Sequence, residues 1–250
     1  IRKGDRVALL LPNSPQFLAA YYGFLSAGAV IVPLNPLSTE SELAFYLSDS
    51  GARMLVTIPL FAGKVAAMPG DTVEHLVVTG LAEFLPFPLN LVQRVKEWSQ
   101  LRGVRHRGLV LFADLIACAP ERSPPRPDVD TGEMAVLIYS GGTTGTAKGI
   151  MLSHFACVVN AFQVVAWGHL SSKARLLAVL PLFHGFGMSV TMNAPVLGGA
   201  EIVLLPRFSA HDVVRTIAKD RPTFLIGVPT MFVALGNLPG IERWNLKSLD

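Results

Sequence analysis

An α/β fold with stacked, mostly parallel sheets flanked by helices is the architecture that this sequence predicts. Short, continuous apolar runs, which suit strands buried on both faces, alternate with longer segments that carry helix start and stop signals. The segments between these runs are long enough for crossover connections, which place successive strands parallel in one sheet. With 250 residues, 51% of them hydrophobic, the chain can bury a core of this kind.

The first half of the chain contains four such apolar runs, and we expect strands at 6–11, 29–33, 53–57 and 75–79. Pro15 is placed to open a helix, because proline suits the first helical position, and Gly28 is placed to end it. Thr39 and Glu42 have the spacing of a capping box, so a second helix is expected from there to Gly51.

The middle of the chain breaks this rhythm, because prolines interrupt the apolar residues between 81 and 130. The alternation then returns, with strands expected at 134–139, 176–180, 201–205 and 223–226, and helices from Ser153, near 185–196, at 210–219 and from Pro229. We therefore predict a first α/β sub-lobe over 1–130, with an irregular insert at 81–130, and a second sub-lobe over 131–250. A single domain with a long surface excursion at 81–130 stays open.

Charge is sparse in this chain. Charged residues make up 16% of it, against about 25% in an average globular protein. Either a partner covers part of the surface or the protein works close to lipid. The net charge of +3 is too small to favour nucleic acid, and Arg102, Arg105 and Arg107 are interpreted as a solvated loop.

The expected location is cytoplasmic. Cys118 and Cys157 lie far apart, show no metal-ligand spacing, and suit a reducing compartment as buried thiols. Uncharged runs at 149–172 and 176–200 exceed the roughly 20 residues that span a bilayer, but their His, Pro and Gly residues favour a buried α/β core. A peripheral position on the inner face of the membrane and a homodimer both stay open.

The segment from Ser140 to Gly149 carries the strongest chemical signal, directly after the apolar run MAVLIY. Its glycines let backbone N–H groups approach an anion, and Lys148 adds a positive charge that suits a polyphosphate. Its hydroxyls can donate to phosphate oxygens or help hold Mg²⁺, and its small and hydroxylated residues are Ser140, Gly141, Gly142, Thr143, Thr144, Gly145 and Thr146.

We expect this loop between a buried strand and a helix, and a flexible Gly/Thr linker would explain neither that position nor the lysine. The spacing fits neither a Walker A loop, nor the GxGxxG fingerprint, nor a GxSxG elbow, so spacing alone indicates generic phosphate binding.

Several stretches resemble one enzyme superfamily. YSGGTTGTAKG at 139–149 closely resembles the phosphate-binding signature of the adenylate-forming superfamily, which includes acyl-CoA synthetases, luciferases and adenylation domains. Ser140 stands where that signature usually has Thr, and Ala147 where it usually has Pro. The segments 4–36, 180–190 and 224–232 are similar to further segments of the same family. Ala147 and FLPFPLNLVQRVKEW at 84–98 favour the bacterial long-chain fatty acid–CoA ligases.

The resemblance implies a two-step reaction in which a fatty acid is activated by ATP to an acyl-adenylate and then joined to CoA. It assigns Ser140 to Lys148 to the phosphates of ATP, with Thr143, Thr144 and Lys148 catalytic and Thr144 beside Mg²⁺. It adds His184 as a catalytic residue near the carboxylate or the mouth of an acyl tunnel. The implied substrate-binding residues are Phe183, His184, Phe186, Val228, Pro229, Thr230 and Met231.

The family's adenine-binding segment, its Tyr-Gly-x-Thr-Glu motif, its ribose-binding Asp, its hinge and its carboxy-terminal Lys have no counterpart up to Asp250. We therefore expect an amino-terminal fragment that lacks the small carboxy-terminal domain and is inactive alone. Three alternatives stay open: another acyl- or aryl-activating adenylating enzyme, a simple nucleotide hydrolase, and a non-enzymatic lipid- or membrane-surface module. The last is suggested by the low charge and by FLPFPLNLV.

Overall fold

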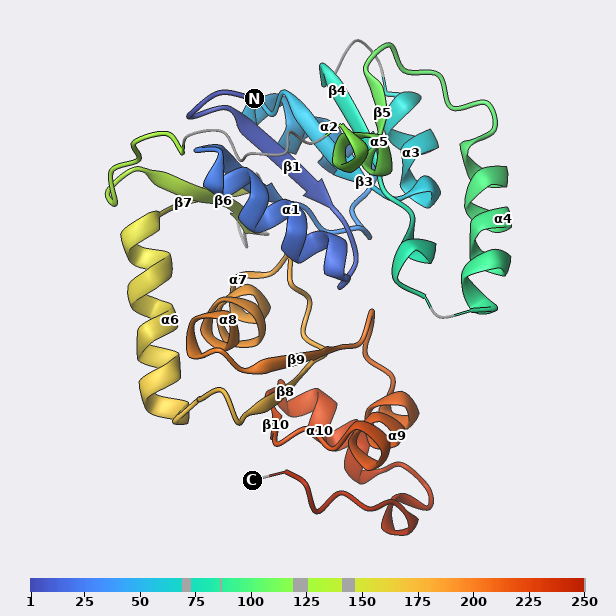
Figure 1. Cartoon of the computed structure of the whole chain (residues 1–250), viewed down its shortest axis with the longest axis vertical. Coiled ribbons are helices and arrows are strands. Elements are labelled where there is room, and N and C mark those ends of the chain that lie inside the picture. Colours follow the sequence, from blue (N-terminus) through green and yellow to red (C-terminus); the bar gives the residue numbers. More distant parts are fainter. Residues whose placement is uncertain (69–72, 86, 119–125, 141–146, 250) are drawn as a thin grey trace. The chain divides into compact units, whose positions relative to one another are not determined.

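The chain forms two compact units. The computed structural model describes residues 1–68, 73–85, 87–118, 126–140 and 147–249. Unit 1 comprises Ile1–Leu11 and Pro15–His154, and unit 2 comprises Pro12–Ser14 and Phe155–Asp250 (Figure 1). Each unit has its own sheet and its own hydrophobic core.

Unit 1 is built on a seven-stranded sheet in the order β5-β4-β3-β1-β2-β6-β7. All neighbouring strands pair in parallel except β6 and β7, which are antiparallel. The strands are β1 Arg6–Leu10, β2 Val30–Pro33, β3 Met54–Thr57, β4 His75–Val78, β5 Leu109–Leu111, β6 Met134–Ser140 and β7 Lys148–Ser153.

The helices of unit 1 follow local signals in the sequence. The α-helices are α1 Pro15–Ser26, α2 Glu40–Ser50, α3 Pro59–Ala66, α4 Leu89–Leu101 and α5 Phe112–Ala117, with a 3₁₀ turn, η1, at Leu81–Phe84. At the start of α2, the Thr39 side chain accepts from the Glu42 backbone and the Glu42 carboxylate accepts from the Thr39 backbone, so the predicted capping box is confirmed. Gly51 ends α2 in the left-handed conformation.

The core of unit 1 lies along the central strands. The strands β1, β2 and β3 are almost entirely buried, which explains why they read as continuous apolar runs rather than as alternating ones. The core cluster includes Leu10, Val32, Leu43, Leu55 and Leu76, contributed by four strands and by α2.

Unit 2 is built on a three-stranded parallel sheet in the order β10-β8-β9. Its strands are β8 Arg175–Ala178, β9 Glu201–Leu204 and β10 Phe224–Leu225. Its helices are α6 His154–Gly168, α7 Gly185–Gly187, a π-helical turn η2 at Met188–Asn193, α8 Ala194–Gly198, α9 Ala210–Asp220, α10 Pro229–Gly236 and a 3₁₀ turn η3 at Ile241–Arg243. The residues at 176–200 therefore form strand, loop and helix within this unit, as the sequence analysis expects.

The predicted α/β class, with mostly parallel sheets flanked by helices, is confirmed. The division of the chain differs from the expected boundary near residue 130. The units divide at His154, because β6 pairs with β2 and carries β7 with it into the first sheet. The segment 81–130 is also more regular than expected, since its described part holds η1, α4, β5 and α5.

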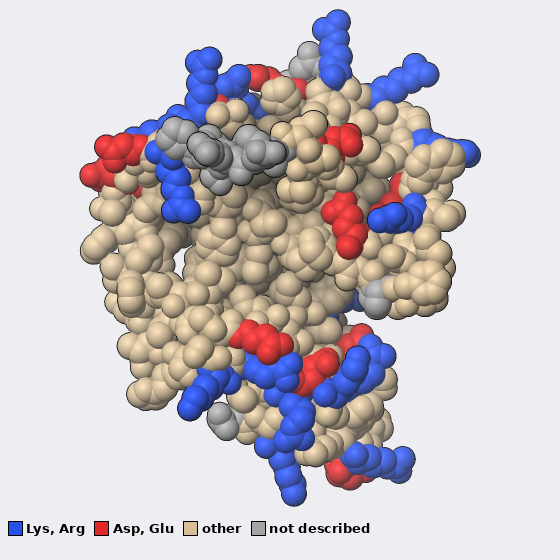
Figure 2. Space-filling view, viewed as in Figure 1, with Lys and Arg blue, Asp and Glu red and all other residues tan. Residues whose placement is uncertain are grey.

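Charge is sparse on the molecular surface as well, as the composition implies. Figure 2 shows one face of the molecule, where broad areas carry neither acidic nor basic side chains. The expectation of buried cysteines is wrong for Cys118, which is exposed near the end of α5; Cys157 on α6 is partly buried. Burial raises the pKa of the Cys157 thiol above its ordinary value, which favours the protonated thiol.

Candidate active site

The Gly/Thr-rich segment connects two antiparallel strands, not a strand and a helix. In the register of β6 and β7, Ser140 lies opposite Lys148 and Tyr139 lies opposite Gly149. The predicted residues Gly141, Gly142, Thr143, Thr144, Gly145 and Thr146 lie outside the described residues. The expectation of a helix directly after the loop is wrong, because β7 comes first and α6 begins at His154. The run Ile150–Leu152 has no period that separates a strand from a helix, and pairing with β6 decides the outcome.

The described ends of the loop are Ser140 and Lys148, which are neighbours across the hairpin. Residues directly opposite in an antiparallel pair have Cβ atoms about 5 Å apart. Lys148 is exposed, and its ammonium group has no ion-pair or hydrogen-bond partner among the residues that the structure describes. Among the described residues, therefore, nothing neutralises this cation, which lies across the β6–β7 pair from Ser140.

Tyr139 anchors the strand from which the loop departs. Its hydroxyl donates a hydrogen bond of 2.6 Å to Asp49 Oδ2 at the end of α2. Its ring packs at 4.6 Å, centroid to centroid, from the ring of Tyr46 on the same helix. Burial, reinforced by the bond to Asp49, raises the pKa of Tyr139 far above its ordinary value, so the phenol stays a hydrogen-bond donor.

Tyr139 has no predicted role of its own, although the sequence carries one signal for it. A tyrosine that ends a buried apolar strand has to find a partner for its hydroxyl, and such a partner fixes the position of the strand end.

His184 occupies the cap position of the short helix α7 in unit 2. Its Nδ1 atom accepts a hydrogen bond of 3.3 Å from the backbone N–H of Phe186. Since Nδ1 accepts, the neutral ring carries its proton on Nε2, and the exposed imidazole presents an Nε2–H donor to solvent. Two phenylalanines flank His184 in the sequence: Phe183, which is half-buried, and Phe186, which is exposed.

Asn13 is a buried polar residue that supports the segment leading to His184. Its Nδ2 atom donates to the carbonyl oxygens of Leu180, at 2.9 Å, and Leu205, at 3.2 Å. Its Oδ1 atom accepts from the backbone N–H of Leu182 at 2.9 Å. One amide thus fixes the backbone after β8 and after β9. Sequence reasoning did not identify this role, because Asn13 reads simply as part of the turn before α1.

Close packing fixes the other end of this segment. A Cβ atom at Gly187 would lie 2.2 Å from the carbonyl oxygen of Pro181, a distance that no side chain can occupy. The turn from Pro181 to Gly187 therefore requires glycine at its end, and the position of His184 within it depends on that close approach.

The second group of predicted substrate residues begins α10. Val228, Pro229 and Thr230 are exposed, whereas Met231 is buried in the core with Leu177. Since β8 and β10 are parallel neighbours, the segments that follow them, with His184 and with Val228, leave the sheet at the same edge. Ligands of parallel α/β sheets bind at the carboxyl ends of the strands, and this edge therefore suits a substrate.

The described residues offer no metal centre of their own, because no group of three or more His, Cys, Asp or Glu side chains gathers in the part of the chain that the structure describes. The donors predicted near Mg²⁺ are hydroxyls, chiefly that of Thr144, which lies outside the described residues. Hydroxyl and phosphate oxygens are donors that Mg²⁺ accepts, so the residue types present fit a metal that is carried mainly by the phosphates of a nucleotide.

A mostly parallel α/β scaffold with a glycine- and threonine-rich hairpin, basic at its base, is typical of an enzyme that handles nucleotide phosphates. Over residues 1–250, the chain matches the family model described as AMP-binding enzyme, and it belongs to that family. The predicted resemblance to the adenylate-forming superfamily is thereby confirmed.

Curated relatives show which enzymes of the family the chain resembles. The chain is 33% identical over 255 residues to a long-chain-fatty-acid–CoA ligase of Bacillus subtilis (strain 168), covering 100% of this chain and 46% of the relative. It is 34% identical over 265 residues to the ligase of the same name from Haemophilus influenzae, covering 100% and 45%. The chain thus spans about half the length of the curated relatives it matches.

A solved structure gives the same result for the fold. The anthranilate CoA ligase AuaEII, crystallised in complex with anthranoyl-AMP, superimposes with a TM-score of 0.82 at 27% identity, over 100% of this chain and 45% of that one. The scaffold described above is therefore one on which CoA ligases are built.

Proposed function

We propose that this chain is part of an ATP-dependent acid–thiol ligase that activates a fatty acid and transfers it to CoA. The observation that carries the proposal is the β6–β7 hairpin. It sets the exposed Lys148, which has no partner among the described residues, opposite Ser140 at the base of the glycine- and threonine-rich loop. Family membership and the names of the relatives support the same reaction class.

The first half-reaction is an attack of the substrate carboxylate on the α-phosphorus of ATP. A bond forms between a carboxylate oxygen and the α-phosphorus. The bond between the α-phosphorus and the oxygen that bridges it to the β-phosphorus breaks, and pyrophosphate leaves with that electron pair. Lys148 and the hydroxyls of Ser140, Thr143 and Thr144 would hold the departing phosphates and neutralise their charge. Mg²⁺ bound to the phosphate oxygens would supply further charge neutralisation. In the second half-reaction, the CoA thiol displaces AMP from the acyl-adenylate to give the thioester.

His184 is proposed to orient the carboxylate. Its Nε2–H is available because Nδ1 is engaged by the Phe186 backbone, and a hydrogen bond from Nε2–H to a carboxylate oxygen fixes the attacking group. Val228, Pro229 and Thr230 begin α10 at the same sheet edge and suit an acyl-binding wall. Met231, which is buried, would support that wall from behind.

The proposed substrate is a long-chain fatty acid. The names of the curated relatives and the 84–98 segment favour it. The alternative is an aryl acid, since the structural relative with anthranoyl-AMP bound is an anthranilate ligase. Competition for the MgATP-loaded protein between palmitate and anthranilate, followed by calorimetry, tests the choice; tighter binding of anthranilate would reverse it.

Binding of MgATP to the wild-type chain and to Lys148→Ala, measured by isothermal calorimetry, tests the phosphate site. A hydrogen bond to a charged group contributes about 1.5–3 kcal/mol, so we expect affinity to fall at least about tenfold. Lys96→Ala is the matched control, because Lys96 is an exposed lysine on α4 of the same unit, and it should change affinity less than about twofold. Equal losses in the two variants, or none in Lys148→Ala, would reject the hairpin as the phosphate site.

A further inference from the structure

Glu97 on helix α4 is a buried carboxylate that no cationic side chain pairs with in the described part of the chain. The residue is only 7% exposed. Its Oε1 atom accepts hydrogen bonds from the backbone N–H groups of Leu81, at 2.8 Å, and Ala82, at 3.2 Å, and from the amide of Gln93 at 2.8 Å. These three donors are neutral, and no ion pair between described residues includes Glu97. A buried charge without an opposite charge nearby lowers stability, so a cation that reached this carboxylate would be held there favourably.

The hydrogen bonds of Glu97 also fix the rotation of α4 about its axis. They hold the polar side of the helix inward, against η1, and leave Val92, Val95 and Trp98 exposed. A surface helix of a globular protein ordinarily shows the opposite arrangement. Because of this rotation, Val95 and Trp98 line a groove beside the helix instead of joining the core.

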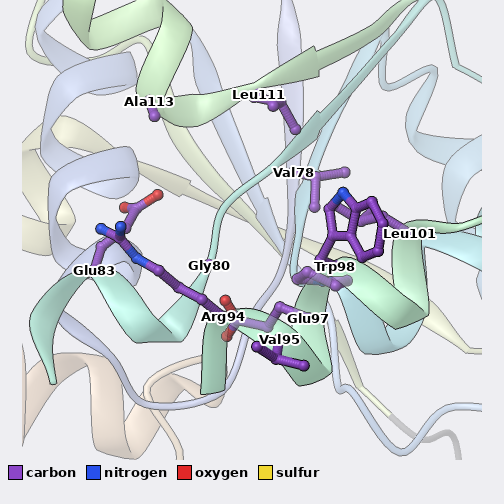
Figure 3. Close-up of a pocket in the computed structure, with 11 residues that line it drawn as sticks. Val78, Gly80, Glu83, Arg94, Val95, Glu97, Trp98, Leu101, Leu111 and Ala113 are labelled. Carbon is purple, nitrogen blue, oxygen red and sulfur yellow. The ribbon is translucent and has the colours of Figure 1, made fainter. Parts of the chain in front are cut away.

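The groove beside α4 has a volume of about 570 Å³, and the buried carboxylate forms part of its lining (Figure 3). The second oxygen of Glu97, Oε2, accepts no hydrogen bond from any residue that the structure describes. A Cβ atom at Gly80 would lie 2.5 Å from Oε2, so glycine at this position leaves the carboxylate its place in the groove. We call this cavity the α4 groove; its lining includes Val78, Gly80, Arg94, Glu97, Trp98 and Leu111.

The α4 groove lies where ligands of α/β proteins ordinarily bind. Val78 is the last residue of β4 and Leu111 the last residue of β5, so the groove is at the carboxyl ends of two parallel strands. Its volume is within the range of small-molecule sites, about 300–1,000 Å³. Strands β3, β1 and β2 separate β4 from β6 in the sheet, so this cavity is a different place from the β6–β7 hairpin.

The α4 groove is apolar at one end and charged at the other. Trp98 and Leu101 of α4 lie at the apolar end, with Leu111 of β5 across from Trp98 (Figure 3). At the charged end, the Arg94 side chain extends toward Glu83 and away from the Glu97 carboxylate (Figure 3). The arginine is therefore directed at the other acidic residue, and the charge of Glu97 is left for a ligand to meet.

This distribution of charge selects the kind of ligand. An anionic head group would meet two carboxylates, those of Glu83 and Glu97, and a single guanidinium, that of Arg94. A neutral molecule would leave Glu97 buried without an opposite charge. A metal ion would need more ligands, and no group of three or more His, Cys, Asp or Glu side chains gathers among the described residues. An ammonium group supplies both a positive charge and N–H donors for Oε2.

We propose that the α4 groove binds a small amine with an apolar body. The ammonium group donates to Oε2 of Glu97, and the apolar body lies against Trp98, Leu101 and Leu111. This site is independent of the proposed phosphate site and of the proposed fatty acid substrate, which carries the opposite charge.

Three compounds that share one phenylalkyl body test the choice of head group: 4-phenylbutylamine, 4-phenylbutan-1-ol and 4-phenylbutanoate. Titrations followed by ligand-detected NMR give the affinity of each compound for the wild-type chain. Because a hydrogen bond to a charged group adds about a factor of ten or more, the amine should bind at least about tenfold more tightly than the alcohol. The carboxylate should bind more weakly than the alcohol. The indole N–H resonance of Trp98, assigned with Trp98→Phe, should shift on addition of the amine.

Glu97→Gln tests the role of the buried charge. Its side-chain oxygen can still accept from Leu81 and Ala82, so the shape of the groove is kept while the charge is removed. The affinity for the amine should fall at least about tenfold, and the affinity for the alcohol should stay within about twofold. Glu40→Gln is the matched control, because Glu40 is an exposed glutamate on α2 of the same unit, and it should change neither affinity more than about twofold.

Ala113→Trp tests the location independently of Glu97. Ala113 lines the groove from α5, and a large side chain there should lower the affinity for amine and alcohol alike, at least about tenfold. Circular dichroism and melting temperature show that each variant is folded. The proposal is overturned if the amine binds the wild type no more tightly than the alcohol or the carboxylate. It is also overturned if Glu97→Gln and Glu40→Gln have equal effects, or if folded Ala113→Trp binds the amine as the wild type does.

Discussion

Replacing Asn13 with alanine removes three buried hydrogen bonds at once. The residue is 5% exposed, and its amide serves the carbonyls of Leu180 and Leu205 and the N–H of Leu182. Each bond contributes about 0.5–1.5 kcal/mol net, so we expect the free energy of unfolding to fall by about 3 kcal/mol. For a chain of this size, 1 kcal/mol shifts the melting temperature by about 2–4 °C, which gives a decrease of about 6–12 °C.

Thermal unfolding followed by circular dichroism measures this shift. Asn237→Ala is the control, because Asn237 is exposed in the same unit and its substitution should cost less than about 0.5 kcal/mol. A loss below 2 °C in Asn13→Ala would show that water replaces the amide, and the argument that Asn13 fixes the backbone before His184 would fail.

Substitutions can test two further contacts in unit 1. Tyr139→Phe keeps the ring but removes the hydrogen bond to Asp49, so MgATP affinity measured by calorimetry should fall about threefold to tenfold. Asp49→Asn should lower the affinity by a similar factor, and the double variant should lower it little further; additive losses would contradict the anchoring role. Hydrogen bonding to Arg53 lowers the pKa of Glu74, and bonding to the Arg2 backbone, helped by Arg53, lowers that of Asp5. These carboxylates stabilise the fold above their unfolded pKa of about 4, and the stabilisation disappears as the pH falls through their lower folded values. In Arg53→Ala the melting temperature should therefore depend less on pH between about 6 and 3, and parallel pH curves for wild type and variant would refute this.

The fold was largely predictable because its strands are buried on both faces. A run such as 6–11, in which only apolar residues follow Arg6, indicates a central strand. The capping residues Thr39 and Glu42 directly mark the start of α2. The strand β7 was not predictable in the same way. It lies at the edge of the sheet with Ile150 and Met151 exposed, so neither alternation nor burial marks it, and only its pairing with β6 defines it.

The candidate site was predictable where the chemistry is local in sequence and not where it depends on distant contacts. Lys148 and Ser140 could be proposed as phosphate-binding residues from the composition of one short segment. The roles of Asp49 and Asn13 could not be predicted, because each residue acts through a partner more than 80 residues away. Nothing in the local sequence pattern distinguishes either residue from an ordinary turn or helix-end residue.

The orientation of α4 shows how two local preferences can conflict. Rotating the helix to bury Val92, Val95 and Trp98 would gain about 1.5–3 kcal/mol for each fully buried large side chain. The bonds from Glu97 to the backbone of η1 contribute about 1.5–3 kcal/mol each, and there are two of them. Within the isolated unit, therefore, the observed rotation is at best close to balance.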